Sequence, residues 1–305
     1  MKIFSVIVTY NAMRHSWIYK CLDSLLSSDL PTEIIVVDNA SSDETCKVIK
    51  DRYPSVSLIE NRENKGFGAA NNQGFEYGIK SNADYFFLLN QDAWIERDCI
   101  QKLVDVAEIN QDFGVISPLH LNGKGDSLDY NFSNYIGPTS CPGLYSDFIL
   151  GRAEKKIYPA EFVNAAAWLL PRKSLEIVGG FSPAFFHYGE DDNYCQRVLF
   201  HQLKIGVYPF AKIFHDREGR EVIQNLHDNK VKLWKLKYSN PVVDCDIRSE
   251  IKYLRKNLFK NKIMRRGQSV ENDRAELNFL ETHVPKLEIY RKESLTMNSY
   301  KFLNQ

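Results

Sequence analysis

The feature that most constrains the fold is a regular alternation of short apolar runs and helical patterns in the first third of the chain. Continuous apolar strands joined by helices of this length form βαβ units in a parallel sheet that is buried on both faces. We therefore expect an α/β fold, with a Rossmann-like, mostly parallel sheet flanked by helices. The expected strands are Phe4–Val8, Ile34–Val37, Val56–Ile59 and Tyr85–Leu89, and the expected helices are Trp17–Leu26, Asp43–Arg52 and Gly68–Lys80.

The rest of the chain has a different character. From about Ser117 to Glu161 it is rich in Gly, Pro, Asn and Ser, which predicts loops and short antiparallel strands. Helical patterns follow at Phe162–Val178 and Glu190–His201, then a strand at Lys204–Tyr208 and a strand end at Ile213–His215. Beyond Asp216 the chain is charged and helical, with a break at Pro241. We expect an α/β domain over 1–216 and a helical C-terminal extension over 217–305.

Composition excludes several classes of protein. The 305 residues include 39 Lys and Arg and 39 Asp and Glu, and this balance argues against a nucleic-acid-binding protein. The six cysteines are scattered, which predicts reduced thiols in a cytoplasmic protein. The apolar run at Ile3–Val8 is too short for a signal peptide, and no stretch approaches the ~20 apolar residues of a transmembrane helix.

Polar residues follow each expected strand, at the edge where parallel α/β sheets bind ligands. These stretches are Thr9-Tyr10-Asn11, Asp38-Asn39, Asn61–Lys65 and Asn90-Gln91-Asp92. A carboxylate such as Asp92 at this edge can hold a hard divalent cation, which in turn holds a diphosphate. An aspartate in an ordinary turn explains the same residue.

Three further segments suggest chemistry. Glu190, Asp191 and Asp192 begin a helix behind an aromatic run, where a carboxylate is suited to general-base work. The helix dipole alone favours acids there by roughly 0.3–1 kcal/mol each. His215, at a strand end, is a candidate metal ligand that Asp216 would orient, or a structural histidine. The glycine-rich stretch 64–74 opens a helix, where backbone amides bind phosphate, although it does not match GxGxxG.

Taken in order, these motifs resemble the family 2 glycosyltransferases of the GT-A fold, and in particular bacterial rhamnosyltransferase-like members. The likeness runs from the start of the chain to about Asp216. It is carried by Val6–Asn11, Ile35–Asp43, Glu63–Asn71, Leu88–Asp92, Gly179–Phe181, Tyr188–Asp191, Arg197 and His215.

The resemblance implies roles for particular residues. Residues 1–116 would bind the nucleotide and residues 117–216 the acceptor. Asp92 and His215 would hold Mg²⁺ or Mn²⁺, Asp191 would be the general base, and Glu190 would position the acceptor. The residues implied to contact the nucleotide sugar are Thr9, Tyr10, Asn11, Asp38, Asn64, Lys65, Gly66, Asn71, Asn90 and Gln91.

The implied reaction is an inverting transfer of rhamnose or another hexose from a dTDP- or UDP-sugar to a saccharide or lipid-linked acceptor in cell-surface polysaccharide synthesis. Three positions depart from the family pattern, because Asn90, Ser182 and Asn193 stand where acids are usual. Two alternatives therefore stay open: an inactive nucleotide-sugar-binding scaffold and a sugar nucleotidyltransferase. The second would normally carry a glycine-rich loop after the first strand, where this chain has Thr9-Tyr10-Asn11.

The segment 251–266 carries seven Lys and Arg, with Ile251, Leu254, Leu258 and Phe259 at helical spacing. Such a basic amphipathic helix can lie on an anionic membrane, here the inner face of the cell membrane. It can also pack its apolar stripe on the main domain or on the second subunit of a homodimer. We favour the packed arrangement and leave both open.

Overall fold

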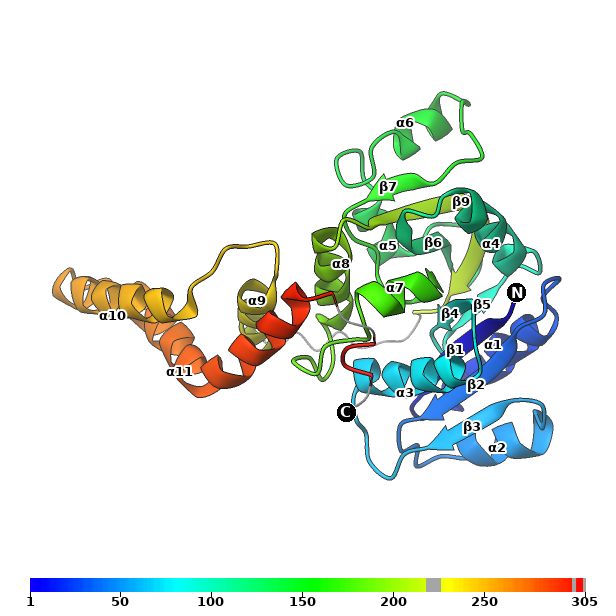
Figure 1. Ribbon diagram of the computed structural model, residues 1–305, viewed down its shortest axis with the longest axis horizontal. Helices are drawn as coiled ribbons and strands as arrows, with labels where there is room; N and C mark the ends of the chain where they lie inside the picture. The colour runs from blue at the N-terminus through cyan, green and yellow to red at the C-terminus, as the bar shows by residue number, and fades with distance from the viewer. Residues whose placement is uncertain (218–225, 298–299, 304–305) are drawn as a thin grey trace. The chain divides into compact units, whose positions relative to one another are not determined.

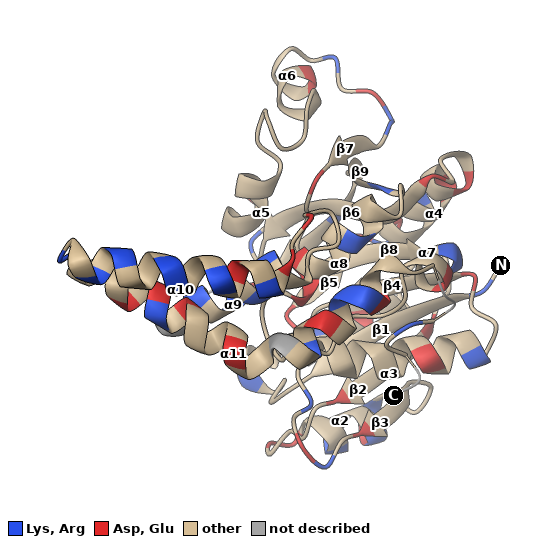
Figure 2. Cartoon of the chain, turned by 60° about the vertical axis from the view of Figure 1, so that its left-hand side comes forward, with Lys and Arg blue, Asp and Glu red and all other residues tan. Residues whose placement is uncertain are grey.

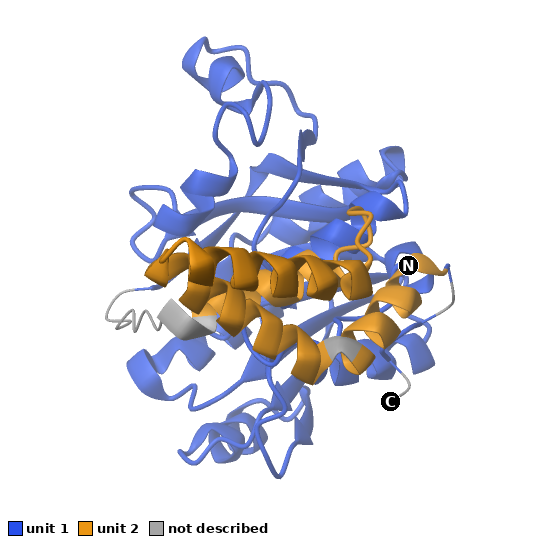
Figure 3. Ribbon diagram, turned by 90° about the vertical axis from the view of Figure 1, so that its left-hand side faces the viewer, with its two compact units in different colours: residues 1–221, 297–305 blue, residues 222–296 orange. Residues whose placement is uncertain are grey.

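The computed structural model describes residues 1–217, 226–297 and 300–303 (Figure 1). The chain divides into two compact units, which Figure 3 distinguishes by colour. Unit 1 comprises residues 1–221 and 297–305, and unit 2 comprises residues 222–296. Residues 297–305, which the sequence analysis assigns to the extension, therefore group with unit 1.

Unit 1 is built on one mixed sheet that has nine strands within the described residues (Figure 1). The strand order is β3-β2-β1-β4-β8-β6-β9-β5, with β7 also paired to β9. Strands β1 to β4 run parallel, β8 is antiparallel to both of its neighbours, and β5 is antiparallel to β9. The strands are β1 Ile3–Thr9, β2 Glu33–Asp38, β3 Ser57–Glu60, β4 Tyr85–Leu89, β5 Ala93–Ile95, β6 Phe113–Asn122, β7 Tyr158–Ala160, β8 Ala167–Pro171 and β9 Lys204–His215.

Helices cover both faces of this sheet. Alternate residues of β1 point to opposite sides, so Ile7 packs with α1, α2 and α4, whereas Val6 packs with α3, α7 and α8. The expected α/β fold with its mostly parallel sheet is confirmed. The helices of unit 1 are α1 Trp17–Leu26, α2 Thr45–Arg52, α3 Phe67–Lys80, α4 Cys99–Ile109, α5 Tyr130–Tyr135, α6 Leu144–Ile149, α7 Arg172–Ile177 and α8 Glu190–Phe200, with a short 3₁₀ turn at Arg14–Ser16.

Two segments differ from the sequence prediction. Phe162–Val178, expected to be helical, holds strand β8 in the middle of the sheet, followed by the short helix α7. Residues Ala167–Leu170 are buried throughout, and a fully apolar run does not distinguish a central strand from a buried helix. The stretch from Ser117 onward was expected to form loops and short strands. Its first residues instead belong to β6, which continues to Asn122.

Residues 300–303 pack within unit 1. The backbone N–H of Gly180 donates to Lys301 O at 2.7 Å, and Asn72 Nδ2 donates to Phe302 O at 3.0 Å. Leu303 is 1% exposed and belongs to the core on the α3 side of the sheet. These contacts support the Gly179–Phe181 segment that precedes α8.

Unit 2 is helical, as expected, and consists of α9 Leu226–Ser239, α10 Ile247–Ile263 and α11 Gly267–Leu295. Helix α9 ends just before Pro241, where the sequence predicts a break. The helices share a small core that includes Tyr238, Leu254 and Leu280. Among the described residues, no helix combines the length and the apolarity that crossing a bilayer requires.

Candidate active site

The strand pairing brings the predicted polar residues to one edge of the sheet in two groups. Thr9 at the end of β1 is in register with Asp38 at the end of β2. On the opposite side of the strand order, Ala93 pairs with His215, which places the preceding residue, Asp92, beside His215. We call the first group, built from Thr9, Asn11, Asp38, Asn39 and Ser41, the β1–β2 cluster.

Asp38 is the centre of the β1–β2 cluster. Its Oδ1 accepts hydrogen bonds from Thr9 Oγ1 at 2.8 Å and from Ser41 Oγ at 2.5 Å, and its Oδ2 accepts from Ser41 N at 2.8 Å. Ser41 Oγ in turn accepts from Asn11 N. Asp38 is 2% exposed, so most of its accepting capacity serves to hold this loop together. Its predicted contact with a nucleobase remains a prediction.

Asn39 organises the glycine-rich turn, and the sequence analysis did not single it out. Its Oδ1 accepts from Lys65 N at 2.9 Å, and its Nδ2 donates to Asn64 Oδ1 at 2.8 Å. Asn64 Oδ1 also accepts from Gly66 N at 2.9 Å. Asn39 therefore holds the turn by hydrogen bonds, while the side chains of Asn64 and Lys65 are exposed at the edge. The signal was available, since Asn39 belongs to the polar pair Asp38-Asn39 that follows the predicted strand Ile34–Val37.

Tyr10 and Gln91 join the ends of β1 and β4. Tyr10 N donates to Gln91 Oε1 at 2.8 Å, and Gln91 Nε2 donates to Tyr10 O at 3.1 Å. This pair of bonds fixes the backbone and leaves Tyr10 half exposed. An exposed ring in a fixed position is suited to stacking against a flat ligand.

Gly66 connects the glycine-rich turn to the aromatic segment before α8. Its φ of +86° is in the region that only glycine enters freely, and a Cβ there would collide with Phe186 O. The next residue, Phe67, donates its N–H to the same Phe186 carbonyl at 3.2 Å. The predicted nucleotide segment and the predicted catalytic helix are thus in backbone contact.

Glu190 and Asp191 lie in the first turn of α8. Glu190 is buried, and its Cβ lies 3.6 Å from the position that a Cβ on Gly68 would occupy. Asp191 is partly exposed, and its Oδ1 accepts from Asp192 N at 2.9 Å. The acids therefore begin the helix where its dipole favours negative charge, at the end that touches the glycine-rich turn. Their catalytic roles remain predictions.

A buried arginine supports the start of α8. Arg197 donates to the backbone carbonyls of Val178 and Gly180 at 2.7 Å each and to Asn193 Oδ1 at 3.1 Å. Burial lowers the pKa of Arg197 to about 10. Asn193, which stands where the family pattern has an acid, is itself buried and serves as a neutral acceptor for this guanidinium. In this chain position 193 thus has a structural partner one turn further along the same helix.

Asp92 and His215 form a buried pair at the β5–β9 end of the edge. His215 Nε2 lies 3.5 Å from Asp92 Oδ1, which is longer than a good hydrogen bond. Two ligands of one octahedral cation, each at about 2.1 Å, lie about 3 Å apart, so the pair fits as part of a coordination shell. No group of three or more His, Cys, Asp or Glu among the described residues is arranged to hold a metal. The remaining ligands would then be water or substrate oxygens.

His215 is oriented by Asp129, not by Asp216 as the sequence suggested. His215 Nδ1 lies 3.3 Å from Asp129 Oδ2, which also accepts from Arg217 Nε at 2.6 Å. Asp216 instead accepts a hydrogen bond from the indole N–H of Trp17 at 3.0 Å. The sequence missed Asp129 because it lies far from His215 in the chain, in a stretch predicted to be loop.

Protonation in this group follows from its contacts. Burial lowers the pKa of His215 below its ordinary value, so the ring is neutral near pH 7. Burial alone would raise the pKa of Asp129, but hydrogen bonds from His215 and from the Phe132 N–H hold it well below the usual value. An ionised Asp129 beside Nδ1 places the ring proton on that nitrogen and leaves the Nε2 lone pair facing Asp92. Two electron-rich atoms that face each other are suited to sharing a cation.

Of two other predicted residues, Asn71 is buried and Asn90 is partly exposed. Asn71 is 2% exposed, and its Nδ2 donates to Phe67 O within α3. The Asn90 backbone bridges to Ala166 and Ala93, while Asn90 Oδ1 is buried and has no hydrogen-bond partner in the part of the chain that the structure describes. Asn90 thus keeps an acceptor available beside Asp92.

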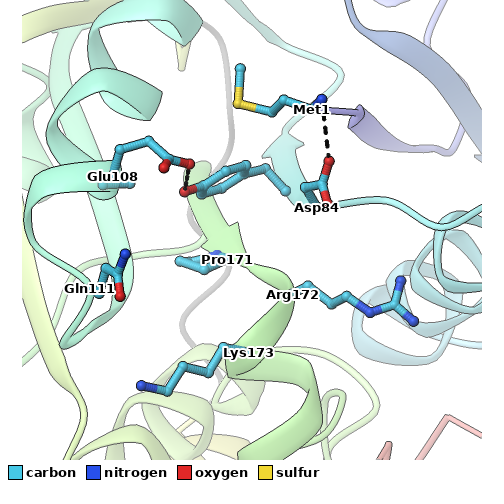
Figure 4. A pocket seen from close by; sticks show the side chains of 9 residues that line it. Met1, Asp84, Glu108, Gln111, Pro171, Arg172 and Lys173 are labelled. Atoms are coloured by element: carbon cyan, nitrogen blue, oxygen red, sulfur yellow. Dashed lines mark hydrogen bonds and ion pairs between the residues drawn. The ribbon is translucent and has the colours of Figure 1, made fainter.

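A cavity of about 320 Å³ lies at the start of β1 and β4, away from this edge (Figure 4). Its polar groups largely bind one another: Tyr85 OH donates to Glu108 at 2.6 Å, and the amino group of Met1 lies 3.7 Å from Asp84. Arg172 donates to Glu176 at 3.1 Å. Because it lies at the amino ends of the parallel strands, this cavity is not where such sheets bind their substrates.

The sheet topology, with acids and amides gathered at the carboxyl ends of the strands, defines a GT-A glycosyltransferase fold. Solved structures agree. S. aureus TarS 1–349 in complex with UDP-GlcNAc superposes with a TM-score of 0.59 at 15% identity, over 97% of this chain and 88% of that one. GalNAc-T7 with UDP, GalNAc and Mn²⁺ superposes with a TM-score of 0.62 at 14% identity, over 99% of this chain and 56% of that one.

The family model described as glycosyl transferase family 2 matches residues 5–176, more than half of the chain. The chain belongs to this family. It is 26% identical over 249 residues to the N-acetylglucosaminyl-diphospho-decaprenol L-rhamnosyltransferase of Mycobacterium tuberculosis, covering 72% of this chain and 79% of that protein.

A second relative is the low-salt glycan biosynthesis hexosyltransferase Agl10 of Haloferax volcanii, which is 24% identical over 190 residues. This alignment covers 61% of the present chain and 59% of the Haloferax protein, so the match leaves much of both chains unaligned. Both relatives are transferases of hexose-type sugars, and the likeness to them and the family match together support the glycosyltransferase assignment made from the sequence.

Proposed function

We propose that this chain is a metal-dependent, inverting hexosyltransferase that uses a dTDP- or UDP-sugar as donor. The observation that carries the proposal is the Asp92–His215 pair, buried at the carboxyl edge of the sheet and held at a spacing suited to a shared cation. The acceptor would be a saccharide or a lipid-linked sugar in cell-surface polysaccharide synthesis. The name of the mycobacterial relative, which describes a rhamnosyltransferase acting on a decaprenol-linked sugar, supports this acceptor class.

The donor nucleotide would lie across the ends of β1 and β2. The half-exposed ring of Tyr10 offers a face for a pyrimidine base, and Thr9 and Asn11 shape the floor beneath it. Lys65 projects from the exposed glycine-rich turn, where it can meet phosphate or sugar oxygens. Two solved structures of TarS, which shares this fold, contain UDP-GlcNAc or UDP, which supports a UDP-sugar as the class of donor.

Mg²⁺ or Mn²⁺ would be held by Asp92 Oδ1 and His215 Nε2. When bound, the cation neutralises the negative charge that develops on the departing diphosphate. The chain's own contribution is to keep both ligands dry and oriented, because Asp129 fixes the His215 ring and burial keeps it neutral. The presence of Mn²⁺ in the GalNAc-T7 structure supports this cofactor class.

Asp191 would act as the general base. The acceptor hydroxyl oxygen forms a bond to the anomeric carbon while the bond from that carbon to the diphosphate oxygen breaks. The proton of the acceptor hydroxyl passes to the Asp191 carboxylate, and the electron pair of the broken bond leaves with the nucleoside diphosphate. Attack opposite the leaving group inverts the anomeric configuration. Asp191 is partly exposed at the start of α8, so it is accessible to an acceptor, and Glu190 would position that acceptor from the same turn.

A panel of nucleotide sugars, assayed for release of nucleoside diphosphate with Mn²⁺, tests the proposal. We expect turnover of one dTDP- or UDP-hexose, stimulated by a polyprenyl-linked acceptor analogue, abolished by EDTA and restored by Mn²⁺ or Mg²⁺. An inactive scaffold would bind a donor and release nothing. A nucleotidyltransferase would instead release pyrophosphate from a nucleoside triphosphate and a sugar phosphate. Full activity in EDTA would remove Asp92 and His215 from their proposed roles.

The proposal places the protein in the cytoplasm, at the inner face of the cell membrane. All six cysteines are free thiols in the structure, which supports a reducing compartment.

A further inference from the structure

Helix α10 carries two separate apolar faces. The inner face, formed by Ile247, Ile251, Leu254 and Leu258, packs into the core of unit 2. Ile251, Leu254 and Leu258 therefore pack against the other helices of unit 2, a partner that the sequence analysis did not foresee. Phe259, which the sequence placed on the same stripe, is 68% exposed.

The outer face of α10, taken together with the C-cap residue Met264, consists of Tyr253, Lys256, Asn257, Phe259, Lys260, Ile263 and Met264. Its four large apolar side chains are each at least half exposed, and together with the two lysines they line one shallow depression of the helix surface. Ile263 lies one helical turn beyond Phe259, so the two side chains stand side by side. Large apolar residues gathered on one exposed face mark an interaction surface more often than scattered single residues do.

The segment that carries this outer face is also strongly cationic. Residues 251–266 contain seven Lys and Arg and no Asp or Glu, although acids and bases balance over the whole chain. Figure 2 shows basic residues recurring along α10. Arg255 is paired with Glu281 of α11 at 2.7 Å, whereas Lys256 and Lys260 form no ion pair with any carboxylate among the described residues.

We propose that the outer face of α10 docks on an anionic lipid bilayer, with the helix lying along the membrane surface. Phe259, Ile263 and Met264 would enter the boundary between headgroups and acyl chains, while Lys256 and Lys260 would meet anionic headgroups. An amphipathic helix with apolar side chains between lysines is the type that binds in this way. Attraction to anionic lipid and burial of apolar area act together on a single face.

Two other occupants fit the surface less well. In a two-fold symmetric dimer the same patch would face itself, which would bring two sets of like charges together. A nucleic acid would satisfy the lysines but would leave Ile263 and Met264 without an apolar partner. The inference stands on unit 2 alone and does not depend on the donor, the acceptor or the cation proposed for the active site.

Sedimentation of the full-length protein with lipid vesicles tests the proposal. We expect binding to vesicles of phosphatidylcholine with phosphatidylglycerol, and little binding to phosphatidylcholine alone. Lys256→Gln with Lys260→Gln should weaken partitioning about tenfold or more, because each basic residue near the surface contributes to the attraction. Phe259→Ser with Ile263→Ser should weaken it by a similar factor on the same vesicles, since it removes the inserted side chains.

The matched control is Lys286→Gln with Lys292→Gln, which changes the charge of unit 2 equally on α11. This variant should bind within about twofold of wild type, and thermal melting should show that all variants keep the fold. An equal loss of vesicle binding in the control variant would show that only the overall charge matters, and it would overturn the proposal. It would also be overturned if wild type ignored anionic vesicles, or if light scattering showed a dimer that Phe259→Ser with Ile263→Ser dissolves.

Discussion

The two ends of the ligand-binding edge are built in opposite ways. In the β1–β2 cluster the side chains bind one another at 2.5–2.8 Å, and the central carboxylate of Asp38 serves its own loop. At the other end, the Asp92 carboxylate and the His215 ring lie 3.5 Å apart, and Asp129 contacts the far side of the ring. The first end is held together by its own hydrogen bonds, whereas the second, under the proposed function, would offer Asp92 and His215 to a cation.

This difference separates recognition from chemistry. Substitutions in the β1–β2 cluster should reduce stability or nucleotide affinity and leave the catalytic step almost unchanged. Substitutions around Asp92, His215 and the start of α8 should reduce the rate or the affinity for a cation and leave the fold intact. If a prediction below fails, recognition and chemistry are not assigned to separate ends of the edge.

The largest effect is expected at Asp191, the proposed general base. Asp191→Asn should lower the rate of transfer by on the order of 10²–10⁴-fold, because a neutral amide cannot accept the acceptor proton. Affinity for the nucleoside diphosphate, measured by calorimetry, should stay near wild type. The neighbouring Asp192→Asn is the matched control and should keep the rate within a few-fold. If the control loses more than Asp191→Asn, the base has been assigned to the wrong carboxylate.

The next effect concerns the positioning of His215. Asp129→Asn keeps the shape of the side chain and its cap on α5 but removes the charge that holds the His215 ring proton on Nδ1. Loss of such a supporting residue typically weakens metal affinity about 10–100-fold. Binding of Mn²⁺ in the presence of UDP, followed by electron paramagnetic resonance, is the readout.

Arg217→Gln provides the comparison, since Arg217 contacts Asp129 without touching His215 in any contact of the described residues. It should change Mn²⁺ affinity by less than about threefold. Equal losses in the two variants would mean that the charge of the whole network matters, and not the orientation of one ring.

In the β1–β2 cluster, Asp38→Asn should act on stability. The amide can replace only one of the two carboxylate oxygens, so a donor from Ser41 or Thr9 is left buried without an acceptor. We expect the free energy of unfolding to fall by about 1–3 kcal/mol in a urea titration. The turnover number of the folded enzyme should change little, and a large drop would bring Asp38 into the chemistry.

The smallest effect is expected for Tyr10→Ala. A stacked ring contributes about 0.5–1.5 kcal/mol beyond its buried area, so its loss should weaken nucleotide affinity roughly two- to tenfold. Stability should not change, because the hydrogen bonds to Gln91 use only the Tyr10 backbone. Unaltered affinity for UDP and dTDP would show that the nucleobase does not stack on the Tyr10 ring.

Much of this arrangement was predictable because it depends on local patterns. Strands β1, β2 and β4 are mostly apolar runs between turn residues, so both their positions and the polar residues that follow them could be identified. The proximity of Asp92 and His215 was also expected, although only as an implication of family resemblance. Strand β8 was missed because a run buried on both faces has no period to distinguish it from a helix.

Long-range contacts were beyond the sequence. Asp129 meets His215 only because β6 and β9 pair and carry the segment after β6 against the end of β9. Asn39 was visible as a strand-end residue, but its contacts with Asn64 and Lys65 depend on how the turn closes over it. Asp216 was chosen to orient His215 because it is adjacent in sequence, whereas its side chain points to Trp17.

The most direct test of the account is a titration of Mn²⁺ into the protein with and without UDP, followed by electron paramagnetic resonance, for wild type and Asp92→Asn. The account predicts one tight Mn²⁺ per wild-type chain when UDP is present, and loss of that tight binding in Asp92→Asn. Equal Mn²⁺ affinity in the two proteins, with UDP bound to both, would contradict it.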